Sequence, residues 1–223
     1  EAAVAEFLAD AGPEGLAASD LDLASFDPFL AVSDQPDVAV AYQKAAAGLA
    51  IGMTQLGSAI HALRPEISKA EAGIAVLDAR SAEATTPNEI DLQTIDFQAI
   101  GDQLGIDFSQ DENDLLQAAL GPLGSALDRV RDVSASGNAG LEEVARVQKV
   151  AQGAASDEIA ALLRGEDADL SQFEGENLGS AVESATVDTV VPTNLKIAAD
   201  QAGKVEGADG ETTELTFTVT RSG

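Results

Sequence analysis

The sequence predicts a mainly α-helical protein, in which an alanine-rich multi-helix bundle over residues 1–190 is followed by a short β segment over residues 191–223. Three observations predict this fold. Apolar residues recur with helical spacing over a long stretch from Asp37 to Leu63. Hydrophobic residues make up 45% of the chain but aromatic residues only 4%, so small side chains must build the core from many helices. Beyond Val187, β-branched residues replace the alanine-rich pattern.

The central helix is predicted between Asp37 and Leu63. Pro36 suits a first helical position, and Pro65 ends the run just beyond Leu63. The apolar residues of this stretch are spaced by three and four, which places them on one predicted buried stripe. They are Val38, Tyr42, Ala45, Leu49, Met53, Leu56, Ile60 and Leu63. A stripe of this length needs partner helices along it.

The chain before the central helix is predicted to be a short helix and a connection. Residues 1–11 carry a helical face that Gly12 and Pro13 end. Residues 15–35 are predicted to form a loop that Phe26 and Phe29 pin to the core.

Helix starts after the central helix are marked by capping patterns. Ser68 and Glu71 have capping-box spacing, as do Ser109 and Glu112. Residues 86–89 give a further start, although the alternation from Ile90 leaves helix and strand both open there. The predicted buried stripe after Ser68 consists of Ile67, Ala70, Ile74 and Leu77.

Glycine and proline divide the second half of the helical region. Residues 121–122 (Gly-Pro) are predicted to break or kink a helix, and residues 137–138 (Gly-Asn) to form a turn. The next helix is predicted to end near Gly153, and Ser156 to cap another that Gly165 closes. Residues 169–186 are a weaker helical candidate. The predicted buried residues are Leu123, Leu127, Val130, Val133, Leu141, Val144, Val147, Val150, Ile159, Leu162 and Leu163.

Two strands are predicted in the β segment, over residues 194–200 and 214–220. The second alternates strictly, with Leu215, Phe217 and Val219 on one face and threonines on the other. Two strands do not make a stable sheet alone. We therefore expect further strands, either from outside this chain or from a neighbouring copy.

The net charge of −27 restricts the partners of the protein. Nucleic-acid binding needs clustered lysine and arginine, so it is not expected here, and neither is an anionic membrane surface. The charge favours solubility and multivalent cations, although a solvated acidic surface accounts for most of the 39 acidic residues. The chain has no cysteine, which excludes disulfides and thiolate chemistry.

Residues 45–63 are long and apolar enough to approach a membrane span, and Gly48 and Gly52 form a small-xxx-small pair. Polar residues such as Gln55 and His61 interrupt the stretch, and no aromatic belt or basic cluster flanks it. We expect a buried helix and no membrane span. Close helix packing explains the two glycines.

Candidate residues for chemistry are few. His61 is the single histidine, and we expect it to be a residue on the flank of the central helix without a chemical role. No nucleophile elbow, phosphate loop or EF-hand pattern occurs, and the chain is not expected to be an enzyme.

Three acidic clusters occur, of which the first two are candidate calcium sites or ordinary loops and the third marks a helix start. Carboxylates at close spacing can hold calcium, but a solvated loop is the simpler interpretation of the first two clusters, and dipole stabilisation of the third. The clusters are Asp20 with Asp22; Glu166, Asp167 and Asp169; and Asp111, Glu112 and Asp114.

The C-terminal segment resembles the opening of a Calx-beta domain. The matching pattern is a first strand, the Glu206–Gly207 pair, a small turn with Asp209, and a threonine-rich strand that ends in Val-Thr-Arg-Ser-Gly. The resemblance covers about the last 30 residues. It implies the first strands of a β-sandwich and a calcium site to which Glu206, and less strongly Asp209, would contribute. The other ligands would lie beyond Gly223.

The region up to Leu63, with the run Asp22-Leu-Ala-Ser-Phe-Asp-Pro-Phe29, is similar to alanine-rich helical modules of very large bacterial surface and secreted proteins. This resemblance implies an extracellular or cell-surface location. It also implies that the chain is a processed or excised piece of a longer polypeptide.

Two functions of different classes follow as hypotheses. The first is a non-catalytic, calcium-linked module for spacing, adhesion or assembly, whose partners are adjacent modules or neighbouring copies. The second is an accessory subunit or helical bundle that binds an apolar ligand beside Gly48, Gly52 and Met53. Catalysis would require residues from outside this chain.

Overall fold

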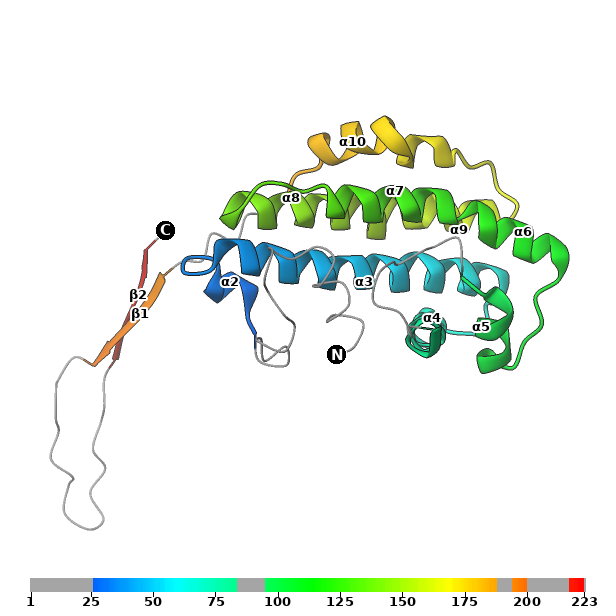
Figure 1. Ribbon diagram of the computed structural model, residues 1–223, viewed down its shortest axis with the longest axis horizontal. Coiled ribbons are helices and arrows are strands. Elements are labelled where there is room, and N and C mark those ends of the chain that lie inside the picture. The colour runs from blue at the N-terminus through cyan, green and yellow to red at the C-terminus, as the bar shows by residue number, and fades with distance from the viewer. Residues whose placement is uncertain (1–25, 84–94, 188–193, 200–216, 223) are drawn as a thin grey trace, which may run out of the picture. The chain divides into compact units, whose positions relative to one another are not determined.

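The computed structural model describes residues 26–83, 95–187, 194–199 and 217–222. The chain is mainly helical and divides into two compact units, residues 1–187 and 188–223. Figure 1 shows the first unit as helices gathered around one long central helix. The predicted helix over residues 1–11, the predicted start at residues 86–89 and Asp20 and Asp22 lie outside the described residues.

The central helix is α3 (Pro36–Leu63), as the sequence predicts. The short helix α2 (Pro28–Ala31) precedes it, and Asp27 caps α2 by accepting hydrogen bonds from the amides of Phe29 and Leu30. The Phe26 ring lies 4.9 Å from the Tyr42 ring of α3, in a tilted arrangement, as expected for a residue that pins this segment. The same role for Phe29 is wrong, because α2 turns Pro28 inward and leaves Phe29 50% exposed.

The helices α4 (Lys69–Glu83) and α5 (Phe97–Leu104) lie on one side of α3. The predicted capping box of α4 is confirmed, because the Ser68 amide donates to Glu71 Oε2 at 2.9 Å and the Glu71 amide donates to Ser68 Oγ at 3.2 Å. The predicted buried stripe holds only in part: Ile67 is buried and Leu77 is half-buried, but the other two positions are not. Ile74 is 55% exposed and Ala70 is exposed. The residues that α4 buries are Ala72, Ala75, Val76 and Ala79.

The helices α6 (Gln110–Ala118) and α7 (Leu120–Arg131) meet at Ala119. The capping box of Ser109 and Glu112 is formed in full at the start of α6. The predicted break falls at this junction, so Gly121 and Pro122 lie in the first turn of α7, where proline is tolerated. The predicted stripe of α7 is confirmed, since Leu123, Leu127, Val130 and Val133 are buried.

The helices α8 (Gly137–Val150) and α9 (Ser156–Leu163) are joined without a break by a π-helical turn, η3 (Ala151–Ala155). The predicted end at Gly153 and cap at Ser156 are therefore wrong: both residues lie within the continuous helix. The predicted turn at residues 137–138 is the first turn of α8, although Gly137 does adopt a positive φ of 62°. Gly165, with a φ of 74°, ends α9 as expected.

The π turn η3, which holds more residues than an α-helical turn, keeps the buried residues of α8 and α9 on the same face. The buried residues here recur every four positions: Val147, Ala151, Ala155, Ile159 and Leu163. In an α-helix of 3.6 residues per turn, each step of four drifts by about 40°. A π turn accommodates one extra residue and takes up that drift. The weaker predicted helix over residues 169–186 is found as η4 (Leu170–Phe173) and α10 (Gly175–Ser184).

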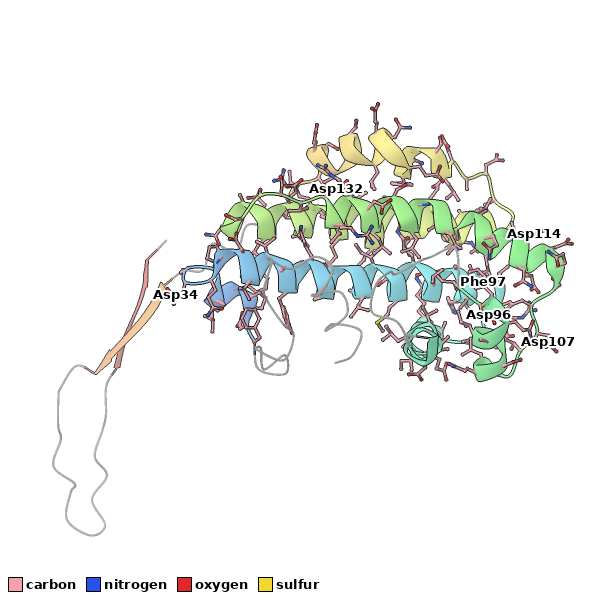
Figure 2. All side chains as sticks on the ribbon, viewed as in Figure 1. Asp34, Asp96, Phe97, Asp107, Asp114 and Asp132 are labelled. Carbon is pink, nitrogen blue, oxygen red and sulfur yellow. The ribbon has the colours of Figure 1, made fainter. Side chains whose placement is uncertain are left out.

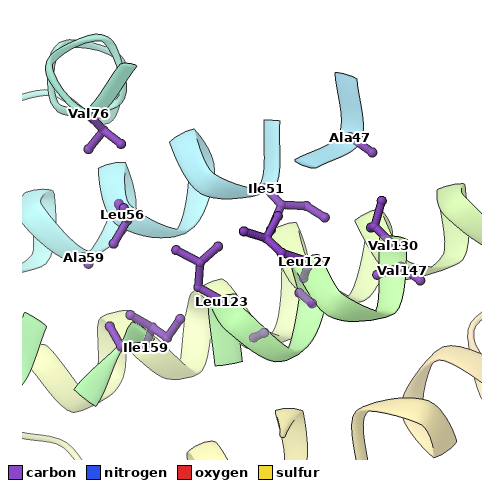
Figure 3. Packing of buried hydrophobic residues seen from close by; sticks show 14 of the residues in the cluster. Ala47, Ile51, Leu56, Ala59, Val76, Leu123, Leu127, Val130, Val147 and Ile159 are labelled. Atoms are coloured by element: carbon purple, nitrogen blue, oxygen red, sulfur yellow. The ribbon is translucent and has the colours of Figure 1, made fainter. Parts of the chain in front are cut away.

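The core of the first unit lies along both sides of α3. Figure 3 shows Ile51 and Leu56 of α3 facing Leu123 and Leu127 of α7, with Val76 of α4 on the other side of α3. Every residue from 55 to 60 is buried, which one stripe cannot produce. The single-stripe prediction is therefore too narrow. Within that stripe only Ala45, Leu56 and Ile60 are buried, and the others are half-buried.

Close packing of α3 against α4 depends on two glycines. A Cβ atom placed on Gly57 would lie 2.7 Å from the carbonyl oxygen of Lys69 and 3.2 Å from the amide nitrogen of Gly73. A Cβ atom on Gly73 would lie 3.3 Å from the carbonyl oxygen of Met53. The close approach predicted for Gly52 is wrong, because no atom lies within 4 Å of a Cβ placed there.

The second unit contains the strands β1 (Asn194–Ala199) and β2 (Phe217–Ser222). They pair antiparallel, with Asn194 opposite Ser222 and Ala199 opposite Phe217. Among the described residues of this unit, these strands form a two-stranded sheet. Glu206 and Asp209 belong to the connection between the two strands and lie outside the described residues.

Candidate functional site

A polar pocket of about 320 Å³ lies where α3, the start of α4 and α9 meet. Its lining includes the single histidine of the chain. The lining residues are Ser58, His61, Ala62, Lys69, Asp157, Ala160 and Arg164. Charged and hydrogen-bonding groups dominate this set, which suits a small polar molecule better than an apolar one. We refer to it as the His61 pocket.

The His61 ring is held by the turn that follows α3. Its Nδ1 atom lies 2.7 Å from the carbonyl oxygen of Ile67, and because a carbonyl only accepts, Nδ1 donates this bond. The neutral ring therefore carries its free lone pair on Nε2. The ring thereby braces the turn between α3 and α4, and the absence of a chemical role for His61 stays a prediction.

Arg164 is oriented by a two-point ion pair with Glu166. The Nε and Nη2 atoms of Arg164 donate to the two carboxylate oxygens of Glu166, at 2.7 and 3.0 Å. These hydrogen bonds from Arg164 lower the pKa of Glu166, and they raise the pKa of Arg164 further, with Asp157 adding to that rise. The guanidinium plane is thereby fixed at the edge of the pocket.

The acidic cluster of Glu166, Asp167 and Asp169 does not converge on a shared site. Glu166 faces Arg164, while Asp169 accepts hydrogen bonds from the amide and the hydroxyl of Ser171 at the start of η4. The cluster at the start of α6 is likewise used locally, since Gln110 donates to Asp114 and Ser109 to Glu112. Figure 2 shows Asp34, Asp96, Asp107 and Asp132 beside helix ends, at separate places in this unit.

Within the described ranges, no group of three or more histidine, cysteine, aspartate or glutamate side chains is placed to hold a metal ion. The predicted calcium ligands, Glu206 and Asp209, lie outside those ranges, so the calcium site stays a prediction.

The Glu112 carboxylate, in the first turn of α6, interacts with the residue that caps the end of α3. Glu112 caps α6 and also forms a two-point ion pair with Arg64, the C-cap of α3, in which Nη2 lies 2.9 Å from Oε2. Desolvation raises the pKa of Glu112, but hydrogen bonds from Ser109 and Arg64 and the charge of Arg64 outweigh it and hold the pKa below its ordinary value of 4.5. The pair joins two helix ends that are 48 residues apart in the chain.

A lysine and a glutamine that are buried on α3 were assigned no role by the sequence pattern. Lys44 is 8% exposed and donates from Nζ to the carbonyl oxygen of Arg131, the last residue of α7, at 2.9 Å. Gln55 is 1% exposed and donates from Nε2 to the carbonyl oxygen of Ala151 at the π turn, at 2.9 Å. Its Oε1 atom has no partner in the described structure. The available signal was a lysine and a glutamine inside an otherwise apolar helix.

Burial lowers the pKa of Lys44, although the charges of Asp132 and Glu143 act in the opposite direction. The charged lysine is therefore less favourable inside the bundle than in water. Its hydrogen bond supplies a donor to a carbonyl at a helix C-terminus, where cations are favoured.

Neither described pocket includes Gly48, Gly52 or Met53. The second pocket, of about 580 Å³, lies between α4 and α5, and its rim includes Glu66, Glu71 and Asp78. The apolar-ligand hypothesis thus stays a prediction. Among the described residues, α3 is long and apolar enough to cross a membrane by length and composition, and half of its most apolar window is buried inside the bundle.

No family model, curated protein or solved structure matches the chain in the comparisons with known proteins.

Proposed function

We propose that the chain is a non-catalytic structural module that joins adjacent modules or neighbouring copies of a bacterial surface or secreted protein. The observation that carries this proposal is the two-stranded sheet of β1 and β2. An isolated two-stranded hairpin is marginally stable in water, because its outer backbone groups remain unpaired and it covers no core. The sheet would be completed by strands from a partner, as in β-strand addition.

The buried polar groups of α3 support the structural role of the bundle. Lys44 ties α3 to the end of α7, and Gln55 ties it to the π turn between α8 and α9. Both of these side chains thus donate to a backbone carbonyl in a neighbouring helical segment. Such bonds fix the alignment of packed helices, which is what a spacing module requires.

The sequence pattern of residues 197–223 is the basis for the expected calcium site. Glu206 and Asp209 lie between β1 and β2 in the chain, where the resemblance to a Calx-beta opening puts acidic ligands. Oxygen ligands of this kind suit calcium, and a bound ion would offset part of the net charge of −27. We place this module outside the cell, where free calcium is abundant.

The test is the mass of the protein in solution by sedimentation velocity, first with calcium and then with a chelator. We expect assemblies larger than the 22.7 kDa chain in calcium and their dissociation in chelator. The variant Ile197→Pro removes one amide donor from β1 and should abolish assembly while leaving the helical circular dichroism unchanged. The variant Glu206→Gln should shift assembly to higher calcium concentrations.

A calcium-indifferent monomer would contradict the proposal. So would assembly that Ile197→Pro leaves intact, because contacts between copies would then not depend on the strands.

A further inference from the structure

The His61 pocket gathers basic residues in a chain that has few of them. The whole chain carries 12 lysines and arginines against 39 acidic residues, with one histidine. Lys69, Arg164 and that histidine share this pocket, and Asp157 is the one carboxylate in its lining. Cationic side chains therefore outnumber the one carboxylate within the lining itself, and Glu166, which pairs with Arg164, lies just outside it.

The hydrogen-bond donors of the pocket are partly free. Glu166 engages Nε and Nη2 of Arg164, which leaves the two N–H groups of Nη1 available. The Nζ atom of Lys69 has no hydrogen-bond or ion-pair partner within the part of the chain that the structure describes. Ser58 adds a hydroxyl group, and its residue is only 1% exposed.

The backbone holds these groups in place. The carbonyl oxygen of Lys69 lies against Gly57, so the first residue of α4 is fixed beside Ser58, the next residue of α3. The bond from His61 to Ile67 fixes the intervening turn. Arg164 is held by Glu166. The His61 ring and the Arg164 guanidinium therefore need little reordering to receive a ligand, which lowers the entropic cost of binding, whereas the exposed Lys69 side chain would be ordered by the ligand.

We propose that the His61 pocket binds a small organic anion through its phosphate or carboxylate group. Arginine and lysine are the side chains that recognise such groups, arginine through planar paired donors and lysine as a point charge. The volume of about 320 Å³ exceeds that of a single phosphate and leaves room for a small organic group beside Ala62 and Ala160. This site is independent of the assembly role of the strands.

The single histidine provides a direct reporter. We would follow the carbon-bound ring protons of His61 by NMR while inorganic phosphate is added, and in a second titration acetate, with chloride at matched ionic strength as the reference. We expect a saturable shift of the His61 signals with phosphate or acetate and none with chloride. The tighter of the two probes identifies the anionic group.

The variant Lys69→Gln should weaken binding about tenfold or more, because it removes a charge-assisted hydrogen bond. Lys69 is exposed, so the fold should persist, and the helical circular dichroism checks this. The matched control is Lys149→Gln, which removes the same charge from α8, where Lys149 donates to the carbonyl oxygen of Thr186 and does not line the pocket. It should leave the affinity unchanged.

The proposal is overturned if neither anion gives a saturable shift. Equal weakening by Lys69→Gln and Lys149→Gln would overturn it as well, since binding would then follow the overall charge and not the pocket.

Discussion

The two sides of α3 are packed in different ways. Toward α4, the backbones approach closely at Gly57, where the carbonyl oxygen of Lys69 leaves no room for a Cβ atom and Gly73 lies in tight contact. Toward α7, α8 and α9, the contact is made by branched side chains such as Leu123 and Ile159. Polar tethers from Lys44 and Gln55 occur on this second side.

The difference shows how a core poor in aromatic residues can still hold a long helix. Close backbone approach gains dispersion contacts but buries little area per residue. Interdigitated side chains bury more area and supply most of the hydrophobic stabilisation. The α4 side should therefore tolerate almost no added volume, whereas the other side should be sensitive to volume removed.

The largest effect is expected from removing volume on the side-chain face. Leu123→Ala in α7, at a fully buried position, should reduce the free energy of unfolding by about 2–5 kcal/mol through lost burial and the cavity left behind. Chemical denaturation measures this. The control Ile74→Ala, at a position 55% exposed on α4, should change stability by no more than about 0.5 kcal/mol. Equal losses in both variants would contradict the comparison.

The second prediction concerns a methyl group added to the face of α3 that packs against α4. Gly57→Ala would bring a Cβ atom against backbone atoms that cannot move aside separately, and should cost about 1–3 kcal/mol. Gly52→Ala is the matched control on the same helix, with no atom within 4 Å of the new Cβ. It should stabilise the protein by about 0.5–1 kcal/mol through helix propensity. Thermal unfolding of the pair separates steric cost from propensity, and a stabilising Gly57→Ala would refute the close approach.

The stabilisation that Glu112 provides through its ion pair with Arg64 should be lost in acid. Because the pKa of Glu112 is lowered in the folded state, its contribution is present above the ordinary value of 4.5 and is lost as pH falls through the lower folded value. Glu112→Gln should cost about 1 kcal/mol at neutral pH, through the weakened capping box and ion pair. The difference from the parent protein should shrink below pH 4.5. A difference that is constant between neutral pH and pH 3 would show that the charge is not involved.

Lys44 should give a smaller effect of the same sign as Glu112, but in the alkaline range. Its folded pKa lies below the ordinary value of 10.5, so the unfolded chain binds more protons in the interval between these values. The lysine contribution to stability should therefore rise with pH in that interval. The variant Lys44→Met keeps the apolar stem and removes the titrating group, so this rise should be absent when denaturation curves of the two proteins are compared from pH 8 to 10.5. An identical alkaline slope in both proteins would exclude desolvation of Lys44 as its cause.

Elements set by local chemistry could be predicted from the sequence. Both capping boxes formed, because Ser68 and Ser109 each find their glutamate three residues later. The stripe of α7 was found because that helix buries one face. The single stripe of α3 failed because α3 is covered on several sides, so periodicity no longer separates buried from exposed positions.

Tertiary features had weaker signals. Gly153 and Ser156 predicted a helix end, whereas the four-residue repeat of buried positions from Val147 to Leu163 was the signal for continuous helix. Of the candidate site, His61 was noted in the sequence, but Lys69 and Arg164 join it only through the folding of α4 and α9 against α3. No spacing rule connects residues so far apart in the chain.

Hydrogen exchange of the two strands at high and low protein concentration tests the assembly proposal most directly. In calcium, we expect the amides of β1 (Asn194–Ala199) and β2 (Phe217–Ser222) to be protected at high concentration and to exchange rapidly after dilution. The amides of α7 should stay protected at both concentrations. Protection of the strands at both concentrations would contradict the proposal that they pair with neighbouring copies. Strands that are unprotected at every concentration would contradict any assembly through β1 and β2.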